Sequence, residues 1–329
     1  MSETRENITA RIFPGLRTKL KNKRGRVVLF VLFLLLIFIA LISADIGAVE
    51  ISQQQIFAII FKKIGVHLST DFTIQQESTL IDIRLPRIVL GALVGAALGI
   101  SGAAMQGLFR NPLADPSLIG ISSGAALAAT FVVIAGDVVS FSMPPFVQLF
   151  VFPIAAFIGA IITTIIIYRL STIAGQTAVA TLLLAGIAIN ALAQAFSGFL
   201  TFYATDTQIR SLTFWKLGSL GGGNWTNILV IAPFIFVPIL LFSKLARPLN
   251  ALLLGESEAG HLGFDIEKVK KITIVLVALS VAASVAFTGL ITFVGLVVPH
   301  LLRLIIGPDH RYLLPGSAIL GACLLLAAD

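Results

Sequence analysis

Polar and apolar positions are segregated into long blocks along this chain. A helix of about 20 apolar residues crosses a bilayer core, and nine apolar runs of roughly that length are present. They occupy residues 27–44, 86–108, 118–136, 145–168, 178–200, 226–243, 272–287, 289–306 and 312–329. The pattern predicts an all-α, polytopic transmembrane helix bundle with about nine spans.

The stretch 84–127 shows how two of these spans are joined. Pro86 suits the first turn of a helix, where its missing N–H is not needed. Small residues follow at roughly helical spacing and would let helices pack closely in lipid; they are Gly91, Gly95, Gly99, Gly102 and Ala103. The polar break 110–117 carries two prolines, which stop one helix and space the next. The stretch therefore predicts a helix–loop–helix hairpin.

The remaining segments are more polar. Residues 1–26 form a basic tail, which divides the chain into that tail and a membrane domain of residues 27–329. Residues 56–61 are apolar but too short to span, so we expect a surface helix on the outer side. Residues 203–225 contain both tryptophans and fit a membrane interface. Residues 244–271 form the longest charged segment after the tail.

Composition and charge place the chain in a membrane and orient it. Of its 329 residues 57% are hydrophobic and 12% charged, whereas soluble domains carry about 25% charged residues. Eight basic residues lie among the first 26, which by the positive-inside rule predicts a cytoplasmic N-terminus rather than a nucleic-acid-binding patch. Nine spans then put all but six of the 23 Lys and Arg residues on the cytoplasmic side. The six outside are Lys62, Lys63, Arg84, Arg87, Arg210 and Lys216.

The sequence lacks the residues of an enzyme or an ion-coupled carrier. No stretch reads G-x-x-x-x-G-K-[ST], so the chain is not expected to bind ATP itself. No nucleophile triad, paired-carboxylate site, metal cluster or cofactor site is recognisable, and the single cysteine, Cys323, reads as a small buried hydrophobe. The spans carry almost no Asp or Glu, which argues against ion coupling and points to an external source of energy.

Two polar features in this apolar background allow two interpretations each. Met105 and Gln106 in the second span, with Asn190 and Gln194 in the fifth, either hydrogen-bond between helices or line a pathway. The amphipathic segment 252–263 (LLLGESEAGHLG) is either a helix that docks into a partner's groove or an ordinary connecting loop.

Longer motifs occur in order from about residue 27 to the end. They are residues 84–87 (RLPR), 101–106 (SGAAMQ), 111–116 (NPLADP), 255–263 (GESEAGHLG) and 293–303 (FVGLVVPHLLR). With these motifs the chain resembles the permease subunits of ABC importers for iron chelates, heme and cobalamin, which have the type II importer fold. The resemblance implies a multi-pass protein of the bacterial plasma (inner) membrane.

The resemblance also implies partners and residue roles. The partners are a second permease copy in a homodimer, or a similar permease, together with two ATP-binding subunits and an external substrate-binding protein. The coupling helix that enters the ATPase cleft would comprise Gly255, Glu256, Ala259, Leu262 and Gly263. Arg84 and Arg87 would pair with glutamates of the binding protein, and Asn111 and Leu113 would belong to the cytoplasmic gate.

Two aspects of the resemblance concern the end of the chain and the substrate. Family members continue past the equivalent of Ala328-Asp329 with a further arginine and a tenth span, so we expect the last span of the family to be missing here, with weaker docking. Residues 110–129, 211–215 and 217–220 look most like the hemin permease branch. Ferric siderophore permeases share much of this pattern and cobalamin permeases less. An ion-coupled secondary transporter and a membrane enzyme are the alternatives from other classes.

Overall fold

A computed structural model describes residues 14–63, 65–66, 68–136 and 144–329. The regular structure in these ranges is helical, apart from an antiparallel hairpin whose two strands have two residues each, β1 (Thr172–Ile173) and β2 (Gln176–Thr177). The helices are α2 (Pro14–Asp45), α3 (Gln53–Lys63), α4 (Ile74–Ser78), the π-helical η1 (Thr79–Arg84), α5 (Leu85–Leu108), the 3₁₀ turn η2 (Pro116–Ile119), α6 (Ile121–Ile134), α8 (Pro145–Leu170), α9 (Val179–Phe202), α10 (Asp206–Leu217), α11 (Trp225–Leu252), α12 (Glu256–His261), α13 (Ile266–Thr288), α14 (Val294–Ile306) and α15 (His310–Ala328).

The helices confirm a polytopic all-α membrane bundle. Among the described residues, seven helices are long and apolar enough to cross a membrane. The other two predicted spans are the shorter helices α6 and α14, of 14 and 13 residues. At 1.5 Å per residue such a helix rises about 20 Å, less than the roughly 30 Å of a bilayer core. These two apolar segments are therefore shorter helices than the sequence predicts, beside seven candidate spans of full length.

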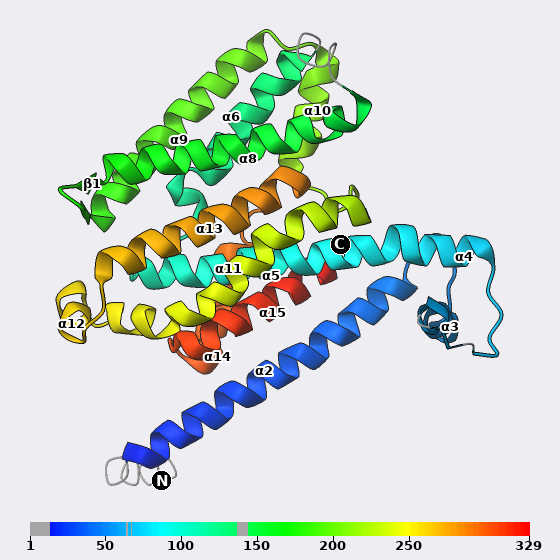
Figure 1. Ribbon diagram of the computed structural model, residues 1–329, viewed down its shortest axis with the longest axis horizontal. Coiled ribbons are helices and arrows are strands. Elements are labelled where there is room, and N and C mark those ends of the chain that lie inside the picture. The colour runs from blue at the N-terminus through cyan, green and yellow to red at the C-terminus, as the bar shows by residue number, and fades with distance from the viewer. Residues whose placement is uncertain (1–13, 64, 67, 137–143) are drawn as a thin grey trace.

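Helix α5 lies at the centre of the bundle. It packs against α15, α14, α13 and α11, while α6, α8, α9 and α10 form a second group on the far side of α13 (Figure 1). Helix α2 runs along the outside of the bundle, next to α15. The hairpin and α12 lie at one end of the bundle, and α3, α4 and α10 lie toward the other. We call these the α12 end and the α3 end.

The small residues of α5 let neighbouring backbones come into contact. A Cβ atom on Gly95 or Gly99 would overlap carbonyl groups of α15, at Gly321 and Ser317. One on Gly102 would overlap the carbonyl of Gly295 in α14. The predicted close packing of small residues is thus confirmed, and it lets these helices associate in lipid, where burying apolar side chains offers no advantage.

Helix α5 begins at Leu85 with Pro86 in its first turn, as predicted, but the chain before it is already helical. Helices α4, η1 and α5 run on continuously from Ile74 to Leu108. In the π turn, Leu85 donates its N–H to the carbonyl of Leu80, five residues back. The next carbonyl, that of Ile81, would need an N–H from Pro86, which has none. The indole Nε1 of Trp225 donates to it instead, at 2.9 Å, so the proline is accommodated inside the helix.

Other boundaries differ for local reasons. Residues 203–225 contain helix α10, whose start is fixed by a capping box between Thr205 and Gln208. Helix α11 continues beyond residue 243 to Leu252. Its last turns carry charged residues and reach the α12 end, so the helix is longer than its apolar run. Residues 289–293 are not helical. The surface helix expected at 56–61 is α3, which buries Ile56, Ala58 and Ile59. The predicted basic tail falls partly in α2 and partly in residues 1–13, outside the described ranges.

We predict that Gly102→Ala destabilises the permease by about 1–3 kcal/mol, because the new methyl group would push α5 and α14 apart. The thermal unfolding midpoint of the detergent-solubilised protein measures this. The matched control is Gly198→Ala in α9, where a Cβ meets nothing within 4 Å and the better helix propensity of alanine stabilises slightly. Equal midpoints for the two variants would contradict the packing argument.

Candidate translocation and coupling sites

A polar cavity of about 620 Å³ lies between α6 and α9. Its volume is within the range of small-molecule sites, about 300–1,000 Å³. Most of the residues that line it carry a hydroxyl or amide group, and one lysine lies at the end of α10. The lining residues are Ser117, Ser122, Ser123, Ala126, Asn190, Gln194, Ser197, Gly198, Thr201, Lys216 and Leu290. The cavity therefore offers hydrogen-bond partners and one cation to a polar or anionic guest.

Asn190 holds the two sides of this cavity together. Its Oδ1 accepts a hydrogen bond from the hydroxyl of Ser123 at 2.5 Å, and its Nδ2 donates to the carbonyl of Ser117 at 3.3 Å. Gln194, one turn further along α9, is exposed and also lines the cavity. The structure thus brings both polar residues of the fifth span to one cavity wall.

Met105 and Gln106 lie elsewhere, fully buried within the bundle. The side-chain amide of Gln106 donates to the carbonyl of Leu296 at 3.1 Å and accepts from Arg303 at 3.2 Å. Gln106 therefore bridges α5 and α14, which is the hydrogen-bonding interpretation of these residues. Of the four residues considered for a pathway, Asn190 and Gln194 line the cavity.

The loop between α5 and η2 leads from the α12 end to the cavity. Asn111 and Leu113 are exposed, and the Oδ1 of Asn111 accepts a hydrogen bond from the N–H of Leu113 at 2.9 Å. Asp115 caps η2 by accepting from the N–H of Ser117 at 2.8 Å. Since Ser117 lines the cavity, the loop with Asn111 and Leu113 adjoins one side of it.

The segment 255–263 contains the short helix α12 (Glu256–His261), which lies at one end of the bundle. Gly255 has a φ of 124° and Gly263 a φ of 87°, both in the region that favours glycine. Ala259 is buried, whereas Leu262 is exposed and Glu256 is partly exposed. The two glycines thus set the ends of a helix that shows an apolar side chain and carboxylates to the outside.

Lys270 is a feature that the sequence did not single out. Its side chain is only 3% exposed, and its ammonium contacts Glu256 at 2.7 Å and Glu267 at 3.0 Å. It also donates to the carbonyl of Thr177 at 2.7 Å. The sequence offers one signal for this ion pair, a lysine three residues after a glutamate in the first turn of an apolar helix. The same spacing is common on solvated helix faces.

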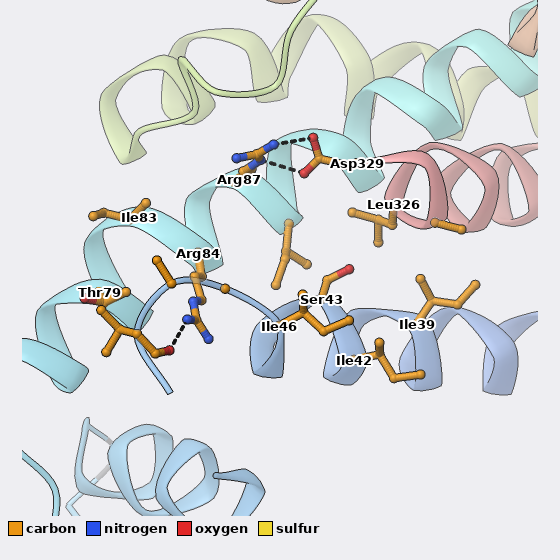
Figure 2. A pocket seen from close by; sticks show the side chains of 15 residues that line it. Ile39, Ile42, Ser43, Ile46, Thr79, Ile83, Arg84, Arg87, Leu326 and Asp329 are labelled. Atoms are coloured by element: carbon orange, nitrogen blue, oxygen red, sulfur yellow. Dashed lines mark hydrogen bonds and ion pairs between the residues drawn. The ribbon is translucent and has the colours of Figure 1, made fainter. Parts of the chain in front are cut away.

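The two arginines of the motif 84–87 point in different directions (Figure 2). Arg84 is 8% exposed and donates to the carbonyls of Ala44 and Asp45 at the end of α2 and of Val49 in the connection to α3. Arg87 is more exposed and forms a two-pronged ion pair with Asp329, at 2.6 and 2.8 Å. Arg84 therefore holds a loop, and Arg87 is the more accessible cation.

These arginines border a second cavity, of about 730 Å³, between the end of α2, the start of α5 and the end of α15. Its other walls are mainly isoleucines, such as Ile39, Ile42 and Ile46. It is the larger cavity, but its lining is more apolar than that of the cavity beside α9. The cavity between α6 and α9 is therefore the better candidate site for a polar guest.

Sequence comparisons agree with these features. The sequence model of the FecCD transport family matches residues 34–329. The chain is 45% identical over 304 residues to the hemin transport system permease protein HmuU of Yersinia pestis, covering 92% of this chain and 86% of that relative. It is 45% identical over 247 residues to the cobalamin import system permease protein BtuC of Halobacterium salinarum, covering 75% and 64%. It is 36% identical over 310 residues to the vitamin B12 import system permease protein BtuC of Vibrio parahaemolyticus, covering 94% and 86%.

A solved structure, described as an inward-facing conformation of a metal-chelate type ABC transporter, matches with a TM-score of 0.79 and 30% sequence identity. That match covers 92% of this chain and 89% of the other. Both the sequence and the arrangement of helices are therefore shared over nearly the whole chain. The chain belongs to the FecCD transport family, the permease subunits of ABC importers.

Proposed function

We propose that this chain is the permease of an ATP-driven importer for an iron complex, and that the complex is hemin. The observation that carries the proposal is a bundle of apolar helices that contains a polar cavity and presents the glycine-bounded helix α12 at one end. The sequence has no phosphate-binding loop of its own, so ATP hydrolysis is assigned to two partner subunits. The transport path would form between two permease copies.

We place the N-terminus and the α12 end in the cytoplasm, because the basic residues of the first 26 positions precede α2's apolar part. Helix α12 then meets the ATP-binding subunits, through Gly255, Glu256, Ala259, Leu262 and Gly263. The α3 end, with Arg87, faces the substrate-binding protein. The loop of Asn111 and Leu113 serves as the cytoplasmic gate of the cavity.

Hemin is favoured by the charge of the cavity. Hemin carries two propionate carboxylates, whereas the corrin ring of cobalamin carries neutral amide groups. The residues that line the cavity include one cation, Lys216, and no Asp or Glu. The identity to the hemin permease also extends over more of both chains than the equal identity to the archaeal cobalamin permease. A ferric siderophore is the second candidate, since its chelating groups are also anionic.

For coupling, we predict that Gly263→Ala lowers transport per ATP hydrolysed severalfold. An alanine at a φ of 87° costs about 1–2 kcal/mol, so the end of α12 would be displaced. The assay is uptake and ATP hydrolysis by the reconstituted importer. The control is Gly260→Ala, in the same helix, where a Cβ meets nothing within 4 Å and φ is not positive. An unchanged ratio in Gly263→Ala would refute the coupling role, and uptake driven by a membrane gradient with an inactive ATPase would indicate an ion-coupled carrier.

For the substrate, we predict that Lys216→Glu reduces hemin uptake at least tenfold, whereas Lys216→Gln reduces it less. The first variant repels carboxylates, and the second only removes the attraction of an exposed cation, which is worth about 1 kcal/mol or less. Uptake of hemin and of cobalamin is measured side by side in proteoliposomes. Equal losses for both compounds, or no loss for hemin, would contradict the proposed selection by charge.

For docking, we predict that Arg87→Glu weakens association with the substrate-binding protein, with the larger effect at low ionic strength. The readout is the association rate measured by surface binding at two salt concentrations. Arg210→Glu, an exposed charge reversal on α10, controls for general electrostatic effects. Association that is unchanged in Arg87→Glu would remove this residue from the docking surface.

A further inference from the structure

We propose that Lys270 is a positioning residue that ties α12 to the start of α9, so that movement of the coupling helix is passed to the helix that lines the polar cavity. The inference rests on the proposed function. It adds a residue and a connection that neither the family motifs nor the cavity by themselves indicate.

The ammonium of Lys270 uses all three of its donors. It binds Glu256 Oε2 at 2.7 Å, Glu267 Oε1 at 3.0 Å and the carbonyl of Thr177 at 2.7 Å. A lysine ammonium has three N–H groups and no acceptor, so its hydrogen-bonding capacity is filled. Because these partners belong to α12, α13 and the β1–β2 hairpin, one buried atom joins three separate elements.

Thr177 is held through both of its backbone groups. Its carbonyl accepts from Lys270, and its N–H donates to Glu267 Oε2 at 2.8 Å. Its hydroxyl also contacts that of Thr172 across the hairpin at 3.0 Å. Helix α9 begins at Val179, two residues later, and carries Asn190 and Gln194 on the cavity wall. A short and fully hydrogen-bonded connection thus runs from the first residue of α12 to the start of α9.

The energetics favour positioning over stability as the purpose of this network. A buried ion pair contributes little net stability, since desolvation offsets the attraction. Replacing the whole pair by apolar residues is often neutral, whereas removing one partner is costly only where the other charge stays buried. Glu256 and Glu267 are 39% and 35% exposed, so water can solvate their carboxylates if the lysine is removed. Loss of Lys270 should therefore leave the bundle folded while releasing α12 from the hairpin.

Hydrogen–deuterium exchange on the permease alone, in lipid nanodiscs, tests the connection independently of any partner. We expect Lys270→Met to raise backbone exchange severalfold in both segments, 172–178 and 255–263. Lys271→Met removes the same charge from the exposed neighbouring position and should leave both unchanged. Increased exchange in only one segment, or in neither, would overturn the inference. If Lys270→Met does not fold, the double variant Lys270→Met with Glu267→Gln is measured in its place. The second substitution removes one of the carboxylates that loses its partner when the lysine is absent.

Transport per ATP hydrolysed in the complete importer tests the consequence. We expect at least a fivefold loss in Lys270→Met, partial recovery in Lys270→Arg and no change in Lys271→Met. If Gly263→Ala uncouples transport but Lys270→Met does not, this inference fails and the proposed function stands. If neither variant uncouples transport, the proposed function fails as well.

Discussion

The structure depends on direct backbone contact between α5 and the helices around it. In lipid, an apolar side chain gains nothing by leaving the solvent for a neighbouring helix, so association must come from close packing. Gly95, Gly99 and Gly102 allow this because a Cβ at any of them would overlap a carbonyl group of α14 or α15. With these helices fixed, polar residues such as Gln106 can be buried with their hydrogen bonds satisfied.

The two ends of the bundle are built differently from its middle. Charged side chains gather where water is available, and at each end one buried cation organises the local chain. Arg84 binds three backbone carbonyls at the α3 end, and Lys270 binds two carboxylates and one carbonyl at the α12 end. In both places the cation fixes a connection between helices.

The polar cavity combines modest hydrogen-bonding capacity with a single charge. Asn190 is already engaged by Ser123 and Ser117, whereas Gln194 and Lys216 contribute polar groups at an accessible surface. A transport path has to release its substrate as well as accept it. A cavity lined by hydroxyl and amide side chains with a single cation fits that requirement better than one lined by a dense cluster of charges.

The sequence by itself determined the membrane bundle and the close-packing face of α5, because hydropathy and small-residue spacing act locally. It left the segment 252–263 open between a docking helix and a connecting loop, and the structure shows the short helix α12 there. Tertiary structure alone decided which polar residues meet. Gln106 and Asn190 look alike in sequence, and both hydrogen-bond between elements, yet only Asn190 also lines the polar cavity. Arg84 and Arg87 likewise belong to one motif, but tertiary contacts bury the first and leave the second accessible. Tertiary contacts also give Lys270 its partner Thr177, which lies 93 residues away. Such contacts depend on how helices distant in the chain are placed, and no local pattern carries that information.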